Sequence, residues 1–235
     1  MNIEKDFYSK ISNWDFYKQI EKASDSNSII LDLGTGGGER VLEDFPIVKK
    51  IIATDFSNKM IETANSNLLK TGKNYIEFKV MDNLDMNVPN DYFDIVTARH
   101  TCIDAKQIYN SLKKGGRLIL KGVDKLDCWN LKTLFKKGQA FNDLKPISLI
   151  DYENIIEVGF RNVELIPIHI REYYKTKEDL IALLLKTPIL NDFSESTDNQ
   201  EKINKDLLNK YIAENTTNKG ILLIRRYYGI TAIKK

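Results

Sequence analysis

The sequence has little of what several classes of protein require. Its 235 residues include two cysteines, Cys102 and Cys128, whose spacing fits neither a metal site nor a disulfide framework. No run of about 18 apolar residues occurs, so we expect no membrane span. The first residues are polar and acidic, unlike a secretory signal. The net charge is only +2, which argues against a nucleic-acid partner. We therefore expect a cytoplasmic, soluble protein without a metal site or a membrane partner.

The most informative segment is residues 29–38, which read Ile-Ile-Leu-Asp-Leu-Gly-Thr-Gly-Gly-Gly. The apolar run predicts a buried parallel strand, and it is followed by four glycines in five positions. Glycine lets the backbone turn sharply and lets a ligand approach the main chain closely. A strand that opens into such a loop and then into a helix is how α/β proteins hold nucleotides.

Two phosphate-binding patterns are missing from this loop. The dinucleotide fingerprint needs a glycine at its sixth position, which is Glu39 here, and a carboxylate at a helix start opposes a pyrophosphate. No Lys-Ser or Lys-Thr pair follows the glycines, which excludes a Walker A loop. A glycine loop with acids at both ends instead favours a ligand that has positive charge and no phosphate, such as S-adenosylmethionine.

Three further segments follow in the order of a wound sheet. Residues 51–57 form a second apolar run that ends at Asp55, and its spacing from the glycine loop places a carboxylate where it can accept both ribose hydroxyls. Residues 75–83 predict a strand followed by Asp-Asn. Residues 93–100 predict a central strand that ends in Ala-Arg-His. A glycine pair and another buried strand come after these, over residues 112–121.

Taken together, residues 28–165 resemble the class I S-adenosylmethionine-dependent methyltransferases. The resemblance implies an α/β fold, a doubly wound seven-stranded sheet that is mostly parallel and has an antiparallel C-terminal strand. It also implies S-adenosyl-L-methionine as the methyl donor. The residues predicted to bind the donor are Asp32, Gly34, Thr35, Gly36, Gly38, Asp55, Phe56, Met60, Asp82, Asn83, Ala98 and Arg99.

The resemblance assigns roles within this set. Asp32 and the glycines would surround the methionine part, and Asp55 would bind the ribose. Asp82 and Asn83 match the position at the edge of the adenine, on which Phe56 would pack. The Asn-Pro-Pro-Tyr signature of methylases that act on base or glutamine amino groups is absent, which leaves oxygen, carboxylate, carbon and other amine acceptors open.

Candidate residues for the acceptor side are fewer. His100 lies just past the central strand and is one of two histidines, so it is the candidate general base if the acceptor must lose a proton. Arg99 offers a partner for an acceptor carboxylate or phosphate. Tyr173 and Tyr174 would either line the acceptor pocket or pack in the core.

The chain outside the sheet is expected to enclose this site. We predict one domain over residues 1–235, with a helical lid at residues 1–27 and a helical cap at residues 175–217 between the last two strands. An enclosed pocket favours a small acceptor. The sequence therefore predicts a methyltransferase that acts on a small molecule by in-line displacement. An RNA or protein methyltransferase, and a non-catalytic S-adenosylmethionine-binding partner or sensor, remain the alternatives, and the oligomeric state is open.

Overall fold

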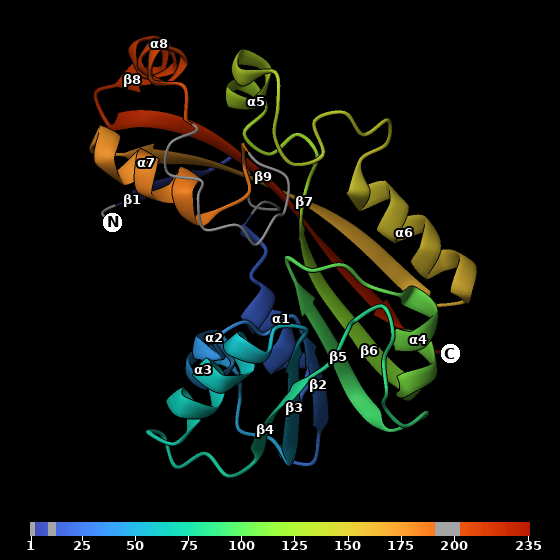
Figure 1. Cartoon of the computed structure of the whole chain (residues 1–235). Coiled ribbons are helices and arrows are strands. Elements are labelled where there is room, and N and C mark those ends of the chain that lie inside the picture. Colours follow the sequence, from blue (N-terminus) through green and yellow to red (C-terminus); the bar gives the residue numbers. More distant parts are fainter. Residues whose placement is uncertain (1–2, 9–12, 191–202) are drawn as a thin grey trace. The chain divides into compact units, whose positions relative to one another are not determined.

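The structure is a computed structural model that describes residues 3–8, 13–190 and 203–235 (Figure 1). The polar stretch 191–199, which separates the two helices of the predicted cap, lies outside the described residues. Within the described part, no helix has the length and apolar character needed to cross a membrane.

The described residues form one nine-stranded sheet with the strand order β1-β7-β9-β6-β5-β2-β3-β4, and β8 pairs with β9. The strands are β1 (Ile3–Phe7), β2 (Ile29–Leu33), β3 (Lys50–Asp55), β4 (Ile76–Val80), β5 (Phe93–Arg99), β6 (Leu112–Val123), β7 (Arg161–Tyr174), β8 (Thr216–Thr217) and β9 (Gly220–Ile233).

The predicted α/β fold is confirmed, whereas the predicted number of seven strands is too low. The pairs β2–β3, β2–β5, β3–β4 and β5–β6 are parallel. Strand β9 is antiparallel to β6, because the Gly115 N–H donates to Lys234 O, just past β9, whereas the Asp124 N–H, just past the other end of β6, donates to Arg226 O. The additional strands are β1, which pairs antiparallel with β7, and the two-residue β8.

Eight helices occur in the described part of the chain. They are α1 (Phe16–Ala23), α2 (Glu39–Asp44), α3 (Asn58–Leu68), α4 (Ala105–Ser111), α5 (Trp129–Phe135), α6 (Ile147–Val158), α7 (Lys177–Lys186) and α8 (Lys205–Asn215). Helices α7 and α8 lie within residues 175–217, the segment predicted as a cap. That they cover a pocket stays a prediction.

The predicted N-terminal lid is only partly helical. Ile3–Phe7 is strand β1, and only Phe16–Ala23 is a helix. The strand reads Ile-Glu-Lys-Asp-Phe, with three charged residues between two apolar ones, and Glu4 and Asp6 pair with Lys219. Five residues are too few for periodicity to distinguish a strand from a turn of helix. The segment is a strand because it pairs with β7.

The chain divides into two compact units where the sequence predicts a single domain with a cap. Unit 1 comprises residues 1–14, 123–148 and 167–227, and unit 2 comprises residues 15–122, 149–166 and 228–235. Strands β7 and β9 have 14 residues each and contribute to both units. The helix of the predicted lid, α1, belongs to unit 2, whereas the helices of the predicted cap, α7 and α8, belong to unit 1.

Unit 2 is organised around strands that are buried along their whole length. All five residues of β2 are buried, and so are the last five of β3. Near-continuous apolar strands of this kind are typical of parallel sheets that are covered on both faces. The parallel register of β2 with β3 and β5 then places the carboxyl ends of these strands side by side at one end of the sheet.

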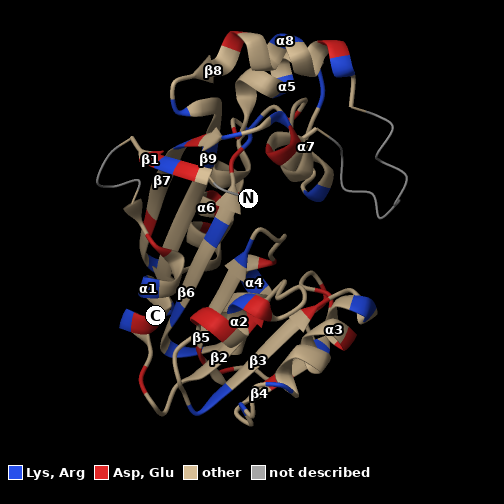
Figure 2. Cartoon of the chain, turned by 90° about the vertical axis from the view of Figure 1, so that its left-hand side faces the viewer, with Lys and Arg blue, Asp and Glu red and all other residues tan. Residues whose placement is uncertain are grey.

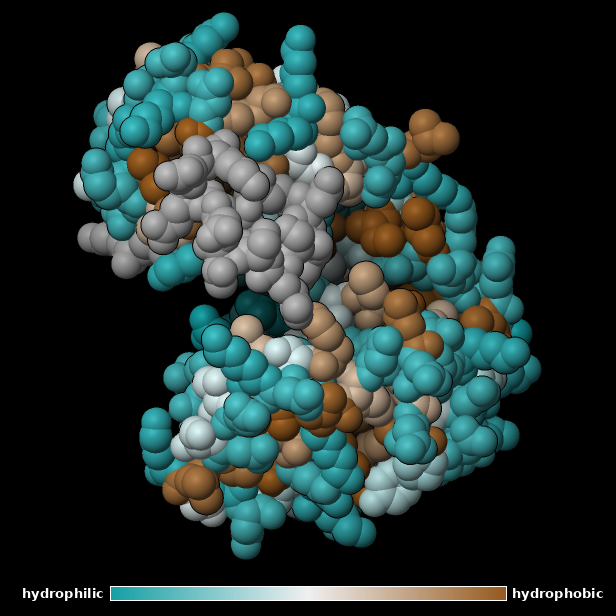
Figure 3. All heavy atoms as spheres, in the orientation of Figure 1, coloured by the Kyte–Doolittle hydropathy of each residue, from teal (hydrophilic) through white to brown (hydrophobic). Residues whose placement is uncertain are grey.

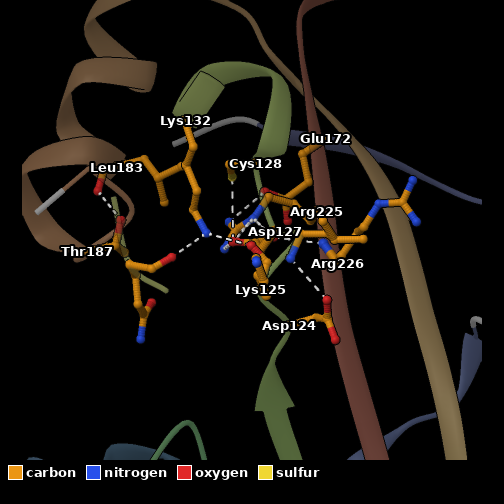
Figure 4. A network of polar contacts seen from close by, with 12 residues as sticks. Asp124, Lys125, Asp127, Cys128, Lys132, Glu172, Leu183, Thr187, Arg225 and Arg226 are labelled. Carbon is orange, nitrogen blue, oxygen red and sulfur yellow. Dashed lines mark hydrogen bonds and ion pairs between the residues drawn. The ribbon is translucent and has the colours of Figure 1, made fainter. Parts of the chain in front are cut away.

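Unit 1 has its own hydrophobic core and a buried group of charges (Figure 4). Arg225 on β9 is paired with Asp127 through Nε–Oδ1 at 2.9 Å and with Glu172 through Nη1–Oε2 at 3.2 Å. All three side chains are at most 8% exposed. Nearby, the buried Lys132 Nζ donates to the carbonyls of Lys125 and Gln139, and burial lowers its pKa.

Candidate functional site

The glycine loop after β2 has the backbone that the sequence predicts. Gly34, Gly36 and Gly38 have φ values of 73°, 60° and 77°, which favour glycine. A Cβ on Gly34 would lie 2.7 Å from the Thr101 side chain, and one on Gly38 would lie 2.6 Å from Phe78. No atom lies within 4 Å of a Cβ placed on Gly36, so the middle of the loop faces open space.

Asp55, at the end of β3, is bound to this loop. Its Oδ2 accepts a hydrogen bond from Gly36 N at 2.9 Å, and its Oδ1 accepts one from Ser57 N at 3.0 Å. Ser57 in turn caps α3 by accepting from Met60 N. Each carboxylate oxygen has a second lone pair, so Asp55 retains acceptor capacity for a ligand.

Asp32 is the second acid of the loop and lies deeper. It is 5% exposed, and its Oδ1 accepts a hydrogen bond of 2.6 Å from the Thr97 hydroxyl. Burial raises its pKa from 3.8 to about 7, against the opposing effects of the Thr97 and Thr35 hydroxyls and of the positive charge on Arg99. The site therefore holds a carboxyl group whose charge changes near neutral pH.

Apolar surface lies beside these acids. The side chain of Phe56 is 62% exposed and that of Met60 is 46% exposed. On the face shown in Figure 3, hydrophobic residues occur in small patches among hydrophilic ones. Phe56 directly follows Asp55 in the sequence and Met60 lies in the first turn of α3, and the exposure of both side chains leaves them available to a flat ligand group.

The loop after β4 carries a buried acceptor that is not satisfied. Asn83 Nδ2 donates to the Thr101 hydroxyl at 2.9 Å, whereas Asn83 Oδ1 is buried and has no hydrogen-bond partner among the described residues. Asp82 is exposed, and its Oδ1 accepts from Leu84 N at 2.8 Å. A buried acceptor without a partner costs free energy, so a ligand that donates to Asn83 would be favoured.

The carboxyl end of β5 lies beside those of the neighbouring parallel strands. Ala98 is buried and Arg99 is half-buried. His100 is exposed and has a φ of 56°, an uncommon backbone conformation for a residue with a side chain, and its N–H donates to Lys121 O at 2.8 Å. The predicted donor-binding residues and His100 all belong to unit 2.

The two tyrosines predicted for the acceptor pocket are buried. Tyr173 and Tyr174 belong to unit 1 and are 7% and 0% exposed. Tyr174 packs in the core of that unit, and its hydroxyl donates to Glu172 Oε2 at 2.8 Å. A fully buried side chain with an occupied hydroxyl is a core residue, which is the second of the two readings that the sequence left open.

Sequence reasoning missed three residues of this site. Thr97 bonds to Asp32, and Thr101 contacts both Asn83 and the position of Gly34. The hydroxyl of Tyr17 on α1 is buried without a partner among the described residues, and its pKa, raised by burial, responds to the charges of Arg99 and Asp32. Serines, threonines and tyrosines are frequent, so no local signal distinguishes these three.

A family comparison identifies this arrangement. Residues 30–117 match the family model described as a methyltransferase domain. The matched range contains the glycine loop, Asp55, the Asp82–Asn83 pair and His100. This match identifies a methyltransferase domain in residues 30–117.

Relatives of this methyltransferase domain include proteins of known structure. The uncharacterized methyltransferase YcgJ of Bacillus subtilis is 29% identical over 98 residues, a match that spans 39% of each protein. Its structure aligns with 94% of this chain and 97% of its own, with a TM-score of 0.59 and 17% identity. A putative methyltransferase from Bacillus halodurans aligns with 94% of this chain and 98% of its own, with a TM-score of 0.58 and 20% identity.

A third solved structure was determined with ligands. It is phosphoethanolamine N-methyltransferase 2 of Haemonchus contortus, in complex with phosphomonomethylethanolamine and S-adenosylhomocysteine. It aligns with 94% of this chain and 53% of its own, with a TM-score of 0.56 and 18% identity. At these identities the likeness to solved structures shows a shared fold for the methyltransferase domain.

Proposed function

We propose that this protein transfers a methyl group from S-adenosyl-L-methionine to a small-molecule acceptor. The observation that carries the proposal is the pair of acids, Asp32 and Asp55, at the ends of adjacent strands around a loop that is open at Gly36. Negative charge there favours a cationic nucleoside and opposes a phosphorylated one.

The polar groups of the site fit such a donor. The ribose has two hydroxyls for the Asp55 carboxylate, and the adenine amino group is a donor for Asp82 and Asn83. The buried Asn83 Oδ1 and Thr35 Oγ1 atoms make no hydrogen bond of good geometry among the described residues. Exposed Phe56 supplies an apolar surface for the adenine ring.

The donor, when bound, supplies a methyl group that its sulfonium already activates. The chain then has to align the acceptor with that methyl group and exclude water. His100, exposed at the end of β5, is the residue proposed to take a proton from the acceptor, and neighbouring Arg99 is proposed to hold an anionic acceptor group.

A small acceptor fits the charge distribution better than a polymer does. Acidic and basic residues share the same helices, as Figure 2 shows for α3 and α8. The sequence alternative of an RNA or protein substrate depends on basic residues of the C-terminal half. Arg225 is buried with Asp127, and Lys175, Lys219 and Lys234 form ion pairs. The H. contortus enzyme, whose complex contains phosphomonomethylethanolamine, is a precedent for a small acceptor on this fold.

Two measurements test the proposal. Calorimetry should show that the purified chain binds S-adenosylmethionine in preference to NAD, and binding of NAD alone would contradict it. Fractions of a cell extract are then assayed for release of S-adenosylhomocysteine. Release with a low-molecular-weight fraction supports the proposal. Binding without release in any fraction supports the non-catalytic alternative, and activity only with RNA or protein fractions supports a polymer substrate.

His100→Ala is expected to slow turnover roughly 100-fold, because it removes the proposed general base. Affinity for S-adenosylhomocysteine should stay within about twofold, since no donor contact is lost. The measurement is release of S-adenosylhomocysteine with the active fraction. His169→Gln is the matched control, because His169 lies in unit 1 against Tyr8 and Arg226. Unchanged turnover in His100→Ala would exclude the general-base role.

Asp32→Asn is expected to flatten the pH dependence of donor binding. The pKa of Asp32 in the folded protein is raised to about 7. Its carboxyl group is therefore protonated in the folded protein below this pH and becomes ionised as the pH rises through this value. The ionised form attracts a cationic donor. Affinity of the wild-type protein should therefore rise about tenfold between pH 6 and pH 8 relative to the variant. If the affinities of the wild-type protein and of Asp32→Asn, measured by calorimetry, change with pH in the same way, the charge of Asp32 does not contribute to donor binding.

A further inference from the structure

The connection from β4 to β5 lacks the helix or strand pairing that normally provides hydrogen-bond partners for backbone N–H and C=O groups. Residues 81–92 are all described and contain no helix, and their ordered feature is an isolated bridge between Asp82 and Asp85. Backbone N–H and C=O groups in such a loop need other partners. Two of these groups, at Leu84 and Met86, are held by a side chain from α4.

That side chain is Gln107, whose amide both accepts and donates a hydrogen bond. Its Oε1 accepts from Met86 N at 2.6 Å, and its Nε2 donates to Leu84 O at 2.7 Å. An amide that donates to one residue and accepts from the residue two positions later replaces a neighbouring β-strand. Gln107 thus fixes the segment that follows Asp82 and Asn83 directly.

Asp104 holds the Gln107 amide in this orientation. Its Oδ2 accepts from Gln107 Nε2 at 3.1 Å, and its Oδ1 caps α4 by accepting from the N–H groups of Lys106 and Gln107. Since Nε2 faces two acceptors and Oε1 faces one N–H, only one amide orientation satisfies all three contacts. The hydrogen bonds to Asp104, that of the Gln107 N–H foremost, also lower its pKa.

We infer that Gln107 is a positioning residue that aligns Asp82 and Asn83 for the amino group of adenine. The inference rests on the proposed function and adds a source of its base selectivity. Asn83 Oδ1 is buried without a partner among the described residues, and Asp82 has an exposed carboxylate. Both groups accept hydrogen bonds. A purine with a carbonyl in place of the amino group would set an acceptor against these acceptors and leave the buried Asn83 Oδ1 unpaired, which sites of this kind reject strongly.

The test compares two ligands that differ at this group. Calorimetry gives dissociation constants for S-adenosylhomocysteine and S-inosylhomocysteine with the wild-type chain, Gln107→Met and the control Lys106→Met. The control changes an exposed neighbour on the same helix. The wild type and the control should prefer the adenine ligand. In Gln107→Met this preference should fall about tenfold, because two hydrogen bonds that fix the loop are lost.

Other outcomes overturn the inference. Equal weakening of both ligands in Gln107→Met would indicate a general structural role, and unchanged affinities would indicate no role. A wild-type chain that binds S-adenosylhomocysteine without preferring adenine contradicts this inference alone. A wild-type chain that binds neither ligand contradicts the proposed function as well. Gln107→Glu, which keeps the acceptor and loses the donor to Leu84, provides the same comparison if Gln107→Met does not fold.

Discussion

Asp55→Ala is expected to weaken binding of S-adenosylhomocysteine by about 1.5–3 kcal/mol, which corresponds to roughly 10- to 150-fold in the dissociation constant. The carboxylate is proposed to accept the two ribose hydroxyls. It also fixes the bend of the glycine loop through its bond to Gly36 N. Both contributions are lost together, and the measurement is isothermal titration calorimetry of the purified variant.

A matched substitution separates this effect from a general loss of charge. Asp91→Ala removes an exposed carboxylate that pairs with Lys234 Nζ at 2.7 Å, and it should leave the affinity unchanged. Thermal unfolding of Asp55→Ala shows whether the chain still folds. A folded Asp55→Ala variant with wild-type affinity would mean that this acid does not bind the ribose.

Arg225→Met is expected to lower the free energy of unfolding by about 3–5 kcal/mol, because it leaves the buried Asp127 carboxylate without its cation and Glu172 with Lys5 alone. Asp127 is 1% exposed, and its two oxygens accept from Arg225 Nε and Nη2. Burial would raise the pKa of Glu172, but the positive charges of Arg225 and Lys5 outweigh it and lower that pKa. Removal of Arg225 takes away the larger of these two charge effects. The measurement is urea denaturation of the whole chain.

The neighbouring Arg226→Met variant is the control for this prediction. Its guanidinium contacts His169 at 3.3 Å and pairs with no buried carboxylate among the described residues, so the expected loss is below about 1 kcal/mol. Adding Asp127→Asn to Arg225→Met should recover part of the lost stability, since it removes one unpaired charge. If Arg225→Met costs no more than the control, the buried charges do not stabilise unit 1.

Much of the donor site follows from short stretches of sequence. The positive φ values at Gly34, Gly36 and Gly38 are the conformations that the glycine-rich loop predicts. The carboxylates of Asp32 and Asp55 reach the same edge because each ends an apolar run, and neighbouring parallel strands end together. These features depend on a few consecutive residues and on the wound order of the sheet.

The N-terminal segment and Tyr174 show where such reasoning does not reach a single answer. Ile3–Phe7 is a strand because the edge of β7 is available to it, with Ile3 opposite Tyr174. Tyr174 is buried because it packs in the hydrophobic core of unit 1 and bonds to Glu172. In both cases the partner lies far along the chain, and the local pattern is compatible with more than one outcome.

By itself, the sequence determined the α/β sheet, the acid-flanked glycine loop and the acids at the strand ends, because backbone sterics and burial patterns act over short distances. Only the tertiary structure decided that Thr101 touches Gly34 and Asn83, that Thr97 bonds to Asp32, and that Gln107 holds the loop at Leu84 and Met86. These contacts join residues from separate loops and strands. Which polar side chains meet there depends on strand register and side-chain direction, which composition and spacing do not specify.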